Sequence, residues 1–371
     1  MPSMNARFLL PGATRAVLPA LPTVLAVVTS SLLFILFLAL QGKPALEAGR
    51  LVLEGAFGSS FAWENTLQRA APLMLTALCV ALPARAGLII IGGEGALVLG
   101  GLAAAVTPLW LPAWPPVLML IFMALAAMVM GGAWIGLSGW MRQRRGVNET
   151  ISSLLLSYIA IALFRQLVEG PLRDPASLNK PSTMPLDDTY TIGNISDAFE
   201  VHWGLAAGAI ACLLAWVLLR YSVAGFSLGV VGGNVRTARM IGLPVDRLML
   251  LTCVLGGAAA GLAGMFEVAA VQGSANDALI AGYGTGGILV AFAARQHPLG
   301  IILCATLIGG IEASGSLLQR RLDLPDATTL ILEGLLFTNL LAWEALNGRI
   351  TRGRIALAAQ GAAQKGEPRH G

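Results

Sequence analysis

The 371-residue sequence is 56% hydrophobic and 12% charged, and its mean hydropathy is +0.75. An average soluble domain is roughly 45–50% apolar and about 25% charged. The 24 basic and 20 acidic residues are too few to cover a soluble domain of this size, so the composition excludes a water-soluble fold. The net charge of +4 comes almost wholly from arginine. The basic residues do not cluster with aromatic residues, so no nucleic-acid partner is expected.

Apolar runs long enough to cross a bilayer recur along the chain. A hydrocarbon core about 30 Å thick takes roughly 20 helical residues. The pattern therefore predicts an all-α, polytopic transmembrane helical bundle of about ten spans surrounded by membrane lipid. The predicted spans are residues 17–40, 66–83, 87–107, 116–140, 149–168, 203–220, 248–271, 281–296, 299–318 and 327–345.

The placement of arginine predicts the orientation. Most arginines lie in loops that fall on one side of the membrane when the amino terminus is placed inside, so both termini are expected to be cytoplasmic. The apolar run ending at Leu40 is too long for a cleaved signal peptide, and no small-residue cleavage site follows it at 41–43. The chain is then one transmembrane domain over residues 17–347 with a cytoplasmic tail at 348–371.

Two loops are long enough to contact a partner. The outer loop, residues 169–202, is net acidic, and it is either a contact surface or simply a solvated loop. The inner loop, residues 221–247, carries Arg236, Arg239 and Arg247 between short apolar stretches. This pattern predicts a brief amphipathic helix at the cytoplasmic face.

Four carboxylates lie inside predicted spans, where a charge is costly and therefore points to function. They are Glu94, Glu267, Glu312 and Glu333. None has an arginine within a helical turn in its own span. Each carboxyl must be paired across helices, protonated, or turned toward a watery path.

Glycine is concentrated around Glu94, over residues 86–101. Glycine lets a membrane helix unwind so that its backbone lines a cavity, and it also lets helices pack closely. The first effect predicts an interrupted helix in this segment. The second would make the segment a packing device in which the Glu94 side chain bonds a neighbouring backbone, and both interpretations stay open.

No enzymatic signature is present. The histidines lie at positions 202, 297 and 370, outside any HExxH spacing, and the four cysteines lie in apolar runs without CxxC spacing. A P-loop needs Gly-Lys-Ser/Thr, but Lys43 and Lys180 precede proline and Lys365 precedes glycine. We expect no catalytic residue, no cofactor, no metal site and no ATPase site.

Four stretches resemble signatures of the permease subunits of ABC importers of the ribose-permease superfamily, in the branch for nucleosides and simple sugars. Residues 84–95 (ARAGLIIIGGEG) are similar to RAGLFNIGxEGQ, and residues 146–159 (GVNETISSLLLSYI) to GxNEVIxTLMLNYI. Residues 282–301, which begin GYGTGGI and end HPLGI, are similar to GYGFxGIAVALLGxxxPxGI. Residues 231–247 (VGGNVRTARMIGLPVDR) resemble VGxNPxAARYAGIxVxR, the family's cytoplasmic coupling helix.

The resemblance implies a translocation subunit of the bacterial inner membrane. Its partners would be a cytoplasmic ATP-binding subunit, a second, homologous permease subunit in a heterodimer, and an extracytoplasmic substrate-binding protein. Docking on the ATP-binding subunit would involve Asn234, Arg236, Thr237, Ala238, Arg239, Ile241 and Gly242. The substrate pathway would be lined or shaped by Gly92, Gly93, Glu94, Gly95, Asn148, Ser157, Glu267 and Glu333.

Departures from the signatures bear on the solute. Ile91, Ala96 and Ser157 stand where the family has Asn, Gln and Asn, and Glu333 stands where it has Gln. A pathway that loses neutral amides and gains a carboxylate has different hydrogen-bonding partners for its solute. In the coupling helix, Val235 replaces the favoured Pro.

Two other functions remain open. An ion- or proton-coupled secondary transporter would use the four membrane glutamates as a relay and would need no ATPase. A structural membrane scaffold would use the glycines for packing alone.

Overall fold

The computed structural model describes residues 12–111, 114–177, 180–196, 199–325 and 327–365. Its internal contacts group the chain into two units. One contains residues up to Leu51 and from Leu318 onward, and the other is Val52–Leu317. Each unit is described by itself.

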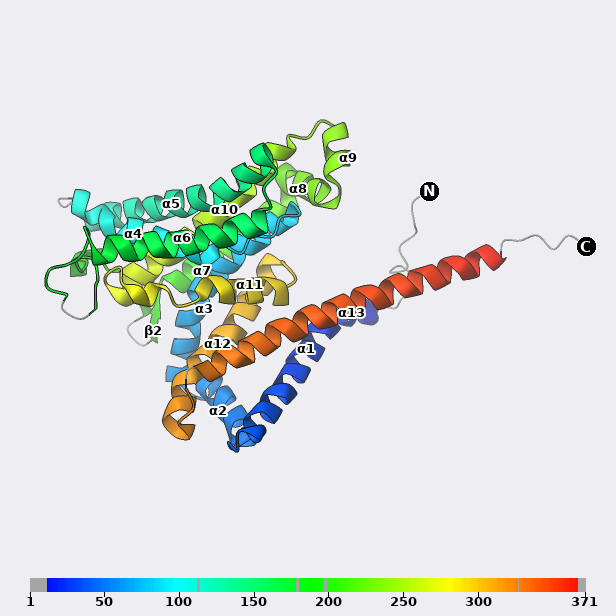
Figure 1. Ribbon diagram of the computed structural model, residues 1–371, viewed down its shortest axis with the longest axis horizontal. Helices are drawn as coiled ribbons and strands as arrows, with labels where there is room; N and C mark the ends of the chain where they lie inside the picture. Colours follow the sequence, from blue (N-terminus) through cyan, green and yellow to red (C-terminus); the bar gives the residue numbers. More distant parts are fainter. Residues whose placement is uncertain (1–11, 112–113, 178–179, 197–198, 326, 366–371) are drawn as a thin grey trace, which may run out of the picture. The chain divides into compact units, whose positions relative to one another are not determined.

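The first unit pairs the helices near the two ends of the chain, α1 (Gly12–Leu40) and α13 (Ala327–Lys365), which lie side by side (Figure 1). Polar side chains join their apolar surfaces. The Ser30 hydroxyl donates to the Leu335 carbonyl at 3.1 Å, and the Thr29 hydroxyl donates to the Asn339 side chain at 3.2 Å. Such interhelical hydrogen bonds contribute to helix association where lipid removes the hydrophobic drive. Helices α2 (Ala45–Phe57) and α12 (Pro298–Leu322) cross the boundary between the units.

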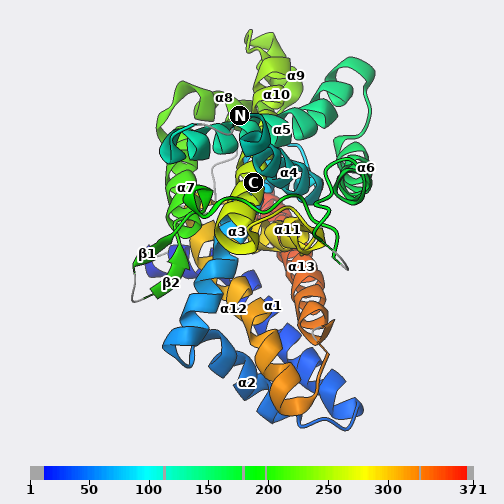
Figure 2. The same ribbon diagram turned by 90° about the vertical axis from the view of Figure 1, so that its left-hand side faces the viewer.

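The second unit contains the remaining elements. Helix α10 contacts α3, α4 and α5, and α4 also contacts α6, so these helices run alongside one another (Figure 1). A short π-helix, η3, continues α10, and a small antiparallel hairpin precedes α7 (Figure 2). The elements are α3 (Ser60–Arg85), α4 (Gly93–Trp110), α5 (Pro116–Arg145), α6 (Glu149–Glu169), η2 (Asp188–Tyr190), β1 (Asn194–Ser196), β2 (Phe199–His202), α7 (Gly204–Tyr221), α8 (Val223–Gly233), α9 (Val235–Met240), α10 (Val245–Phe266), η3 (Glu267–Gln272), η4 (Asp277–Leu279) and α11 (Tyr283–Ala293).

Glycine sets the distances between α10 and its neighbours. A Cβ added to Gly261 of α10 would lie 2.1 Å from the Ala127 carbonyl oxygen of α5. A Cβ on Gly100 of α4 would lie 2.4 Å from the Gly261 Cα. The three backbones therefore approach as closely as small-residue membrane interfaces allow. Residues 93–110 are continuous helix, so the glycines beyond Gly93 act in packing.

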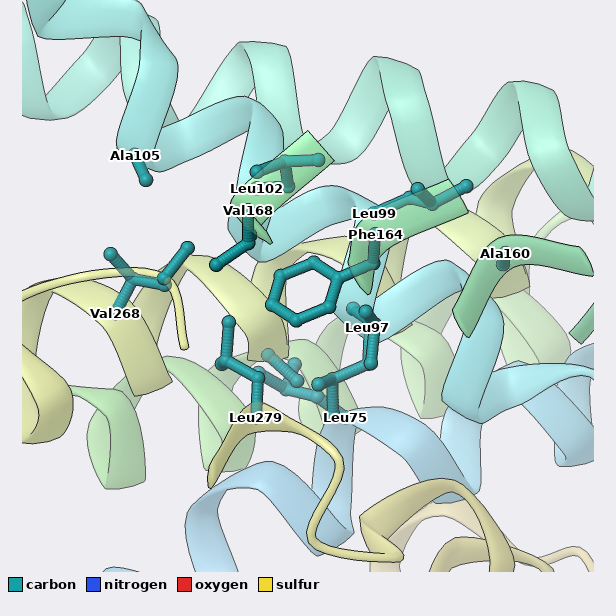
Figure 3. Close-up of a cluster of buried hydrophobic side chains, with 13 residues drawn as sticks. Leu75, Leu97, Leu99, Leu102, Ala105, Ala160, Phe164, Val168, Val268 and Leu279 are labelled. Carbon is teal, nitrogen blue, oxygen red and sulfur yellow. The ribbon is translucent and has the colours of Figure 1, made fainter. Parts of the chain in front are cut away.

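An apolar core joins α6 to this group of helices. The Phe164 ring of α6 is fully buried among side chains from α3, α4 and the η3–η4 region, including Leu75, Leu97, Val268 and Leu279 (Figure 3). A buried aromatic ring contributes the largest apolar contact area of any core side chain. The core fixes the face that α6 presents to α4.

The described residues contain nine helices long and apolar enough to cross a membrane, which confirms the polytopic helical bundle. The expected span at 281–296 does not form. There, α11 has only 11 residues, about 16 Å of helix, because Gly282 (φ +87°) delays its start and Arg295 (φ 51°) and Gln296 (φ 58°) end it. The inner loop also differs, since it forms two helices, α8 and α9, where one was expected. The interruption expected within 86–101 is confined to residues 86–92.

We predict that Gly261→Ala lowers the stability of the protein. The new methyl group would overlap the Ala127 carbonyl, and overpacking of this kind costs about 1–3 kcal/mol. Gly229→Ala is the matched control, since no atom lies within 4 Å of a Cβ at that position. The check is the midpoint of thermal unfolding of the detergent-solubilised chain, and equal midpoints for the two variants would contradict the packing role.

Candidate functional site

The chain leaves helical geometry between α3 and α4, at residues 86–92. Gly87 has φ +79°, a left-handed conformation that glycine adopts without the cost a side chain would bring. The helices on both sides are largely buried. Since a backbone in such surroundings cannot rely on water, its N–H and C=O groups need partners from the protein.

Helix α6 supplies those partners from one face. The side chains of Glu149, Ser153 and Ser157 are four residues apart and therefore lie in a row on the helix. The Ile89 N–H donates to the Glu149 carboxylate at 3.3 Å and the Ile91 N–H to the Ser153 hydroxyl at 3.1 Å. The third member of the row follows the same pattern: the Gly95 N–H donates to the Ser157 hydroxyl at 2.9 Å. We call these three side chains the α6 ladder.

The start of α6 is itself firmly held. Asn148 is its N-cap, and its side chain accepts from the N–H groups of Thr150 (2.9 Å) and Ile151 (3.3 Å). The buried Glu149 carboxylate forms an ion pair with Arg142 at the end of α5. Asn148 therefore shapes the site by fixing the first rung of the α6 ladder. Glu149 and Ser153 were missed from the sequence, although their positions eight and four residues before Ser157 were a signal.

Glu94 joins two helix beginnings. It lies in the first turn of α4, and only 7% of it is exposed. Its carboxylate accepts from the N–H of Gly282 at 2.9 Å and from the N–H of Gly284, at the start of α11. A carboxylate at this place satisfies N–H groups that have no partner within the helix and complements the positive end of the helix dipole. The Gly93 backbone also lies close, since a Cβ there would be 3.7 Å from the Gly284 Cα.

The other membrane carboxylates have different surroundings. Glu312 of α12 forms an ion pair with Arg69 of α3 at 3.9 Å, so this carboxylate is paired across helices. Glu267 is 3% exposed at the start of η3, and within the described chain its carboxylate has no hydrogen bond or ion pair. Glu333 lies on α13, in the first unit.

Tyr283, the first residue of α11, is within electrostatic reach of several of these groups. Glu94, Glu267, Glu312 and Arg69 all act electrostatically on its side chain, and the Thr76 hydroxyl of α3 donates to its carbonyl at 2.9 Å. The fold therefore gathers three of the four predicted carboxylates with one arginine. Arg69 and Tyr283 were not predicted as site residues, although an arginine early in an apolar span is a signal for a buried acidic partner.

The segment expected to couple the chain to an ATPase lies at α8 and α9. Asn234 caps α9, and its side chain accepts from Arg236 N–H at 2.9 Å and Thr237 N–H at 3.2 Å. Ala238 is buried, while the flanking side chains are exposed. A hollow of about 520 Å³ opens beside Val235, Arg236, Arg239 and Met240.

The end of this segment is tied to α10. Arg239 pairs with Asp246, in the first turn of α10, at 3.3 Å. Gly242 takes φ +80°, which turns the chain from α9 toward α10, and Ile241 beside it is 61% exposed. The predicted coupling residues thus form one continuous surface feature, apart from the buried Ala238.

The outer loop is bound to the membrane helices over residues 183–192. In an α-helix the Ala269 carbonyl would accept from the Gly273 N–H. In η3 the Gly273 N–H bonds Val268 instead (2.9 Å), and Ile192 of the loop donates to the Ala269 carbonyl at 2.8 Å. Leu186 N–H donates to the Gly273 carbonyl at 2.7 Å. This part of the loop is therefore a fixed cover over the helix that carries Glu267.

Two titratable groups of the outer loop are perturbed. The backbone and side chain of Thr189 donate to Asp187, which lowers the pKa of this carboxyl. Burial lowers the pKa of His202, whose Nδ1 accepts from the Gly204 N–H at 3.1 Å. His202 is therefore neutral with its proton on Nε2. Among the described residues no three His, Cys, Asp or Glu side chains are grouped as metal ligands.

Comparison with known proteins places the whole membrane region in one family. The family described as branched-chain amino acid transport system / permease component matches residues 62–341. The glucose ABC transporter permease protein TsgB13 of Haloferax volcanii is 32% identical over 319 residues, which are 82% of each chain. The guanosine ABC transporter permease protein NupP of Bacillus subtilis is 28% identical over 75% of this chain and 80% of its own. The probable riboflavin import permease protein RfuC of Treponema pallidum is 26% identical over 74% of both.

These matches span the non-helical residues 86–92, which we call the break, and also the α6 ladder, the segment from α8 to α9 and the start of α11. They agree with the nine apolar helices of the described residues. The chain therefore belongs to the branched-chain amino acid transport system permease family and is a multi-pass membrane permease component of an ABC transporter.

Proposed function

We propose that the chain forms the translocation path of an importer that carries a small, polar, hydroxyl-rich solute inward, with a nucleoside or a simple sugar as the favoured class. The observation that carries the proposal is the 32% identity to a glucose permease over 82% of the chain. Other relatives are named for guanosine and riboflavin. Glucose, guanosine and riboflavin all carry several hydroxyl groups on a sugar or sugar-like chain.

The carboxylates near Tyr283 suit such a solute. A carboxylate accepts hydrogen bonds from hydroxyl groups at several lone-pair positions. Glu94 is already occupied by two backbone N–H groups, whereas Glu267 has no such partner among the described residues. We therefore assign Glu267 to solute contact and Glu94, with Gly92, Gly93 and Gly95, to shaping the path. Asn148 and Ser157 support that shape, and Glu333 is proposed as a further lining residue.

Transport follows from alternating access without covalent chemistry on the solute. The broken backbone at 86–92 and the short helix α11 meet at Glu94, so a shift of either changes the path at one point. The segment from Asn234 to Gly242 receives the motion of the ATP-binding subunit. The chain itself carries no ATPase site, and all energy from ATP arrives at this segment.

The complete transporter contains further subunits. We propose a cytoplasmic ATP-binding subunit, a second homologous permease that makes a heterodimer, and an extracytoplasmic substrate-binding protein that meets the outer loop 169–202. The assembly lies in the bacterial inner membrane. One permease domain over 17–347, with the coupling loop 221–247 and the tail 348–371 in the cytoplasm, is consistent with this arrangement.

Glu94→Gln tests the site. The amide keeps one acceptor but loses the charge at the start of α11 and turns an NH₂ group toward backbone donors. We expect an uptake rate lower by about tenfold, since losing a buried charge-assisted hydrogen bond costs ~1.5–3 kcal/mol. Uptake by membrane vesicles is measured with labelled glucose and guanosine, and Glu54→Gln, at an exposed position of α2, is the control. Unchanged uptake would favour a purely structural role for the glycine-rich segment.

Arg236→Glu combined with Arg239→Glu tests the coupling segment. Both side chains are exposed beside the hollow on α9, so the double variant is expected to insert normally. We expect it to lose both uptake and copurification with the ATP-binding subunit, because two positive charges become negative at the docking surface. Normal uptake by this variant would refute the coupling role.

The alternative of a proton- or ion-coupled transporter rests on the gathering of Glu94, Glu267 and Glu312 around Tyr283. The two functions differ in their need for ATP. We expect vesicles that contain only the purified chain to show no uptake of labelled glucose or guanosine under a proton gradient. Uptake by the chain alone would replace the ABC importer with the secondary transporter.

A further inference from the structure

The coupling segment makes a second contact besides the one to α10, and this contact leads to the break. Helix α8 ends at Gly233, one residue before the Asn234 cap of α9. A Cβ on Gly232, in its last turn, would lie 2.2 Å from the Arg85 carbonyl oxygen and 3.4 Å from the Gly87 nitrogen. From the other side, a Cβ on Gly87 would lie 3.6 Å from the Gly232 Cα. Two backbones therefore touch with no side chain between them.

The place of this contact in the chain gives it significance. Arg85 is the last residue of α3, and Gly87 is the left-handed second residue of the break. Seven residues later the chain reaches Glu94, which holds the start of α11. A segment of seven residues spans at most about 25 Å. A displacement of α8 would therefore act on the first residues of the break, and Glu94 lies two residues beyond the last residue of the break.

The α6 ladder limits what the break can do. Glu149 and Ser153 hold the N–H groups of Ile89 and Ile91. The segment from 86 to 88 precedes the first rung, and Gly87 within it has the conformational freedom of glycine. The N–H groups of Ala86, Gly87 and Leu88 donate to the carbonyls of Pro83 and Ala84, so the start of the break is joined to the end of α3 and not to α6.

The alternative route through α10 differs in character. Arg239 and Asp246 join α9 to α10 by an exposed ion pair, a weak type of contact. Helix α10 packs closely on α3, α4 and α5, so it moves as part of a rigid group. The contact at Gly232 is in comparison tight, since backbone meets backbone, and it is made at the end of α3, where the helix gives way to the break.

We infer that Gly232 is a positioning residue that transmits movement of the coupling segment to residues 85–92, and through them to Glu94 and α11. The inference rests on the proposed coupling role of α9. It specifies where the movement enters the membrane region.

The matched variants lie in the same helix. Gly232→Ala introduces a methyl group into the contact, whereas Gly233→Ala and Gly229→Ala meet no atom within 4 Å. In the complex of the full chain with its ATP-binding subunit, we expect Gly232→Ala to keep ATP hydrolysis while uptake per ATP hydrolysed falls by about tenfold. The two control variants should keep the wild-type ratio. An unchanged ratio for Gly232→Ala overturns the inference.

A measurement on the wild-type complex covers the case in which Gly232→Ala does not assemble. Hydrogen exchange of the amides at 85–92 is compared between the nucleotide-free complex and the complex trapped with ATP. We expect their exchange to change by at least about threefold, together with the exchange of 234–242. A change at 234–242 without one at 85–92 overturns the inference and leaves the coupling role intact. Normal uptake by the Arg236→Glu, Arg239→Glu variant overturns the coupling role, and the inference falls with it.

Discussion

A backbone that leaves helical geometry inside an apolar protein must find new hydrogen-bond partners, and much of the site follows from how residues 86–92 meet this requirement. The N–H groups of residues 86–88 donate to backbone carbonyls at the end of α3, and those of Ile89 and Ile91 donate to side chains of α6. The helix that resumes at Gly93 places Glu94 against the start of α11. These bonds tie α3, α4, α6 and α11 to one short stretch of chain, which keeps a defined shape without a continuous helix.

The carboxylates illustrate how burial separates roles among chemically identical groups. Glu94 is consumed by two backbone donors, Glu312 faces Arg69, and Glu267 has neither kind of partner within the described chain. The cost of burying each charge is met in a different way, by a helix start for Glu94, by an ion pair for Glu312 and by the electrostatic influence of Arg69 for Glu267. Only the third arrangement leaves the carboxylate oxygens without a hydrogen bond from the described chain. The outer loop also contacts the helix that carries Glu267. The Ile192 N–H donates to the Ala269 carbonyl, which has no N–H partner from Gly273 because η3 is a π-helix.

Local pattern was sufficient to predict the helical spans, the glycine-rich interruption near Glu94 and a short inner helix rich in arginine. It was insufficient where geometry depends on distant segments. The run at 281–296 is apolar enough for a span. However, Gly282 lies before the first helical residue of α11, and its N–H donates to the carboxylate of Glu94, 188 residues earlier in the chain. Some side chains of the site have partners on other helices, as in the ion pair of Arg69 with Glu312 and in the rungs Glu149 and Ser153. A single sequence does not show which helices are neighbours. The helices that carry the glutamates could therefore be predicted from the sequence, while the partners of these side chains could not.

Ser157 has a consequence for the distance between two helices as well as for the hydrogen bonds of the site. Its hydroxyl accepts from Gly95, and a Cβ on Gly95 would lie 2.7 Å from the Ser157 Cα, so α4 and α6 approach almost to backbone contact at this level. A longer amide side chain at 157 would need more room between the two helices. The residue at this position thus acts as a spacer that sets how closely α4 and α6 approach.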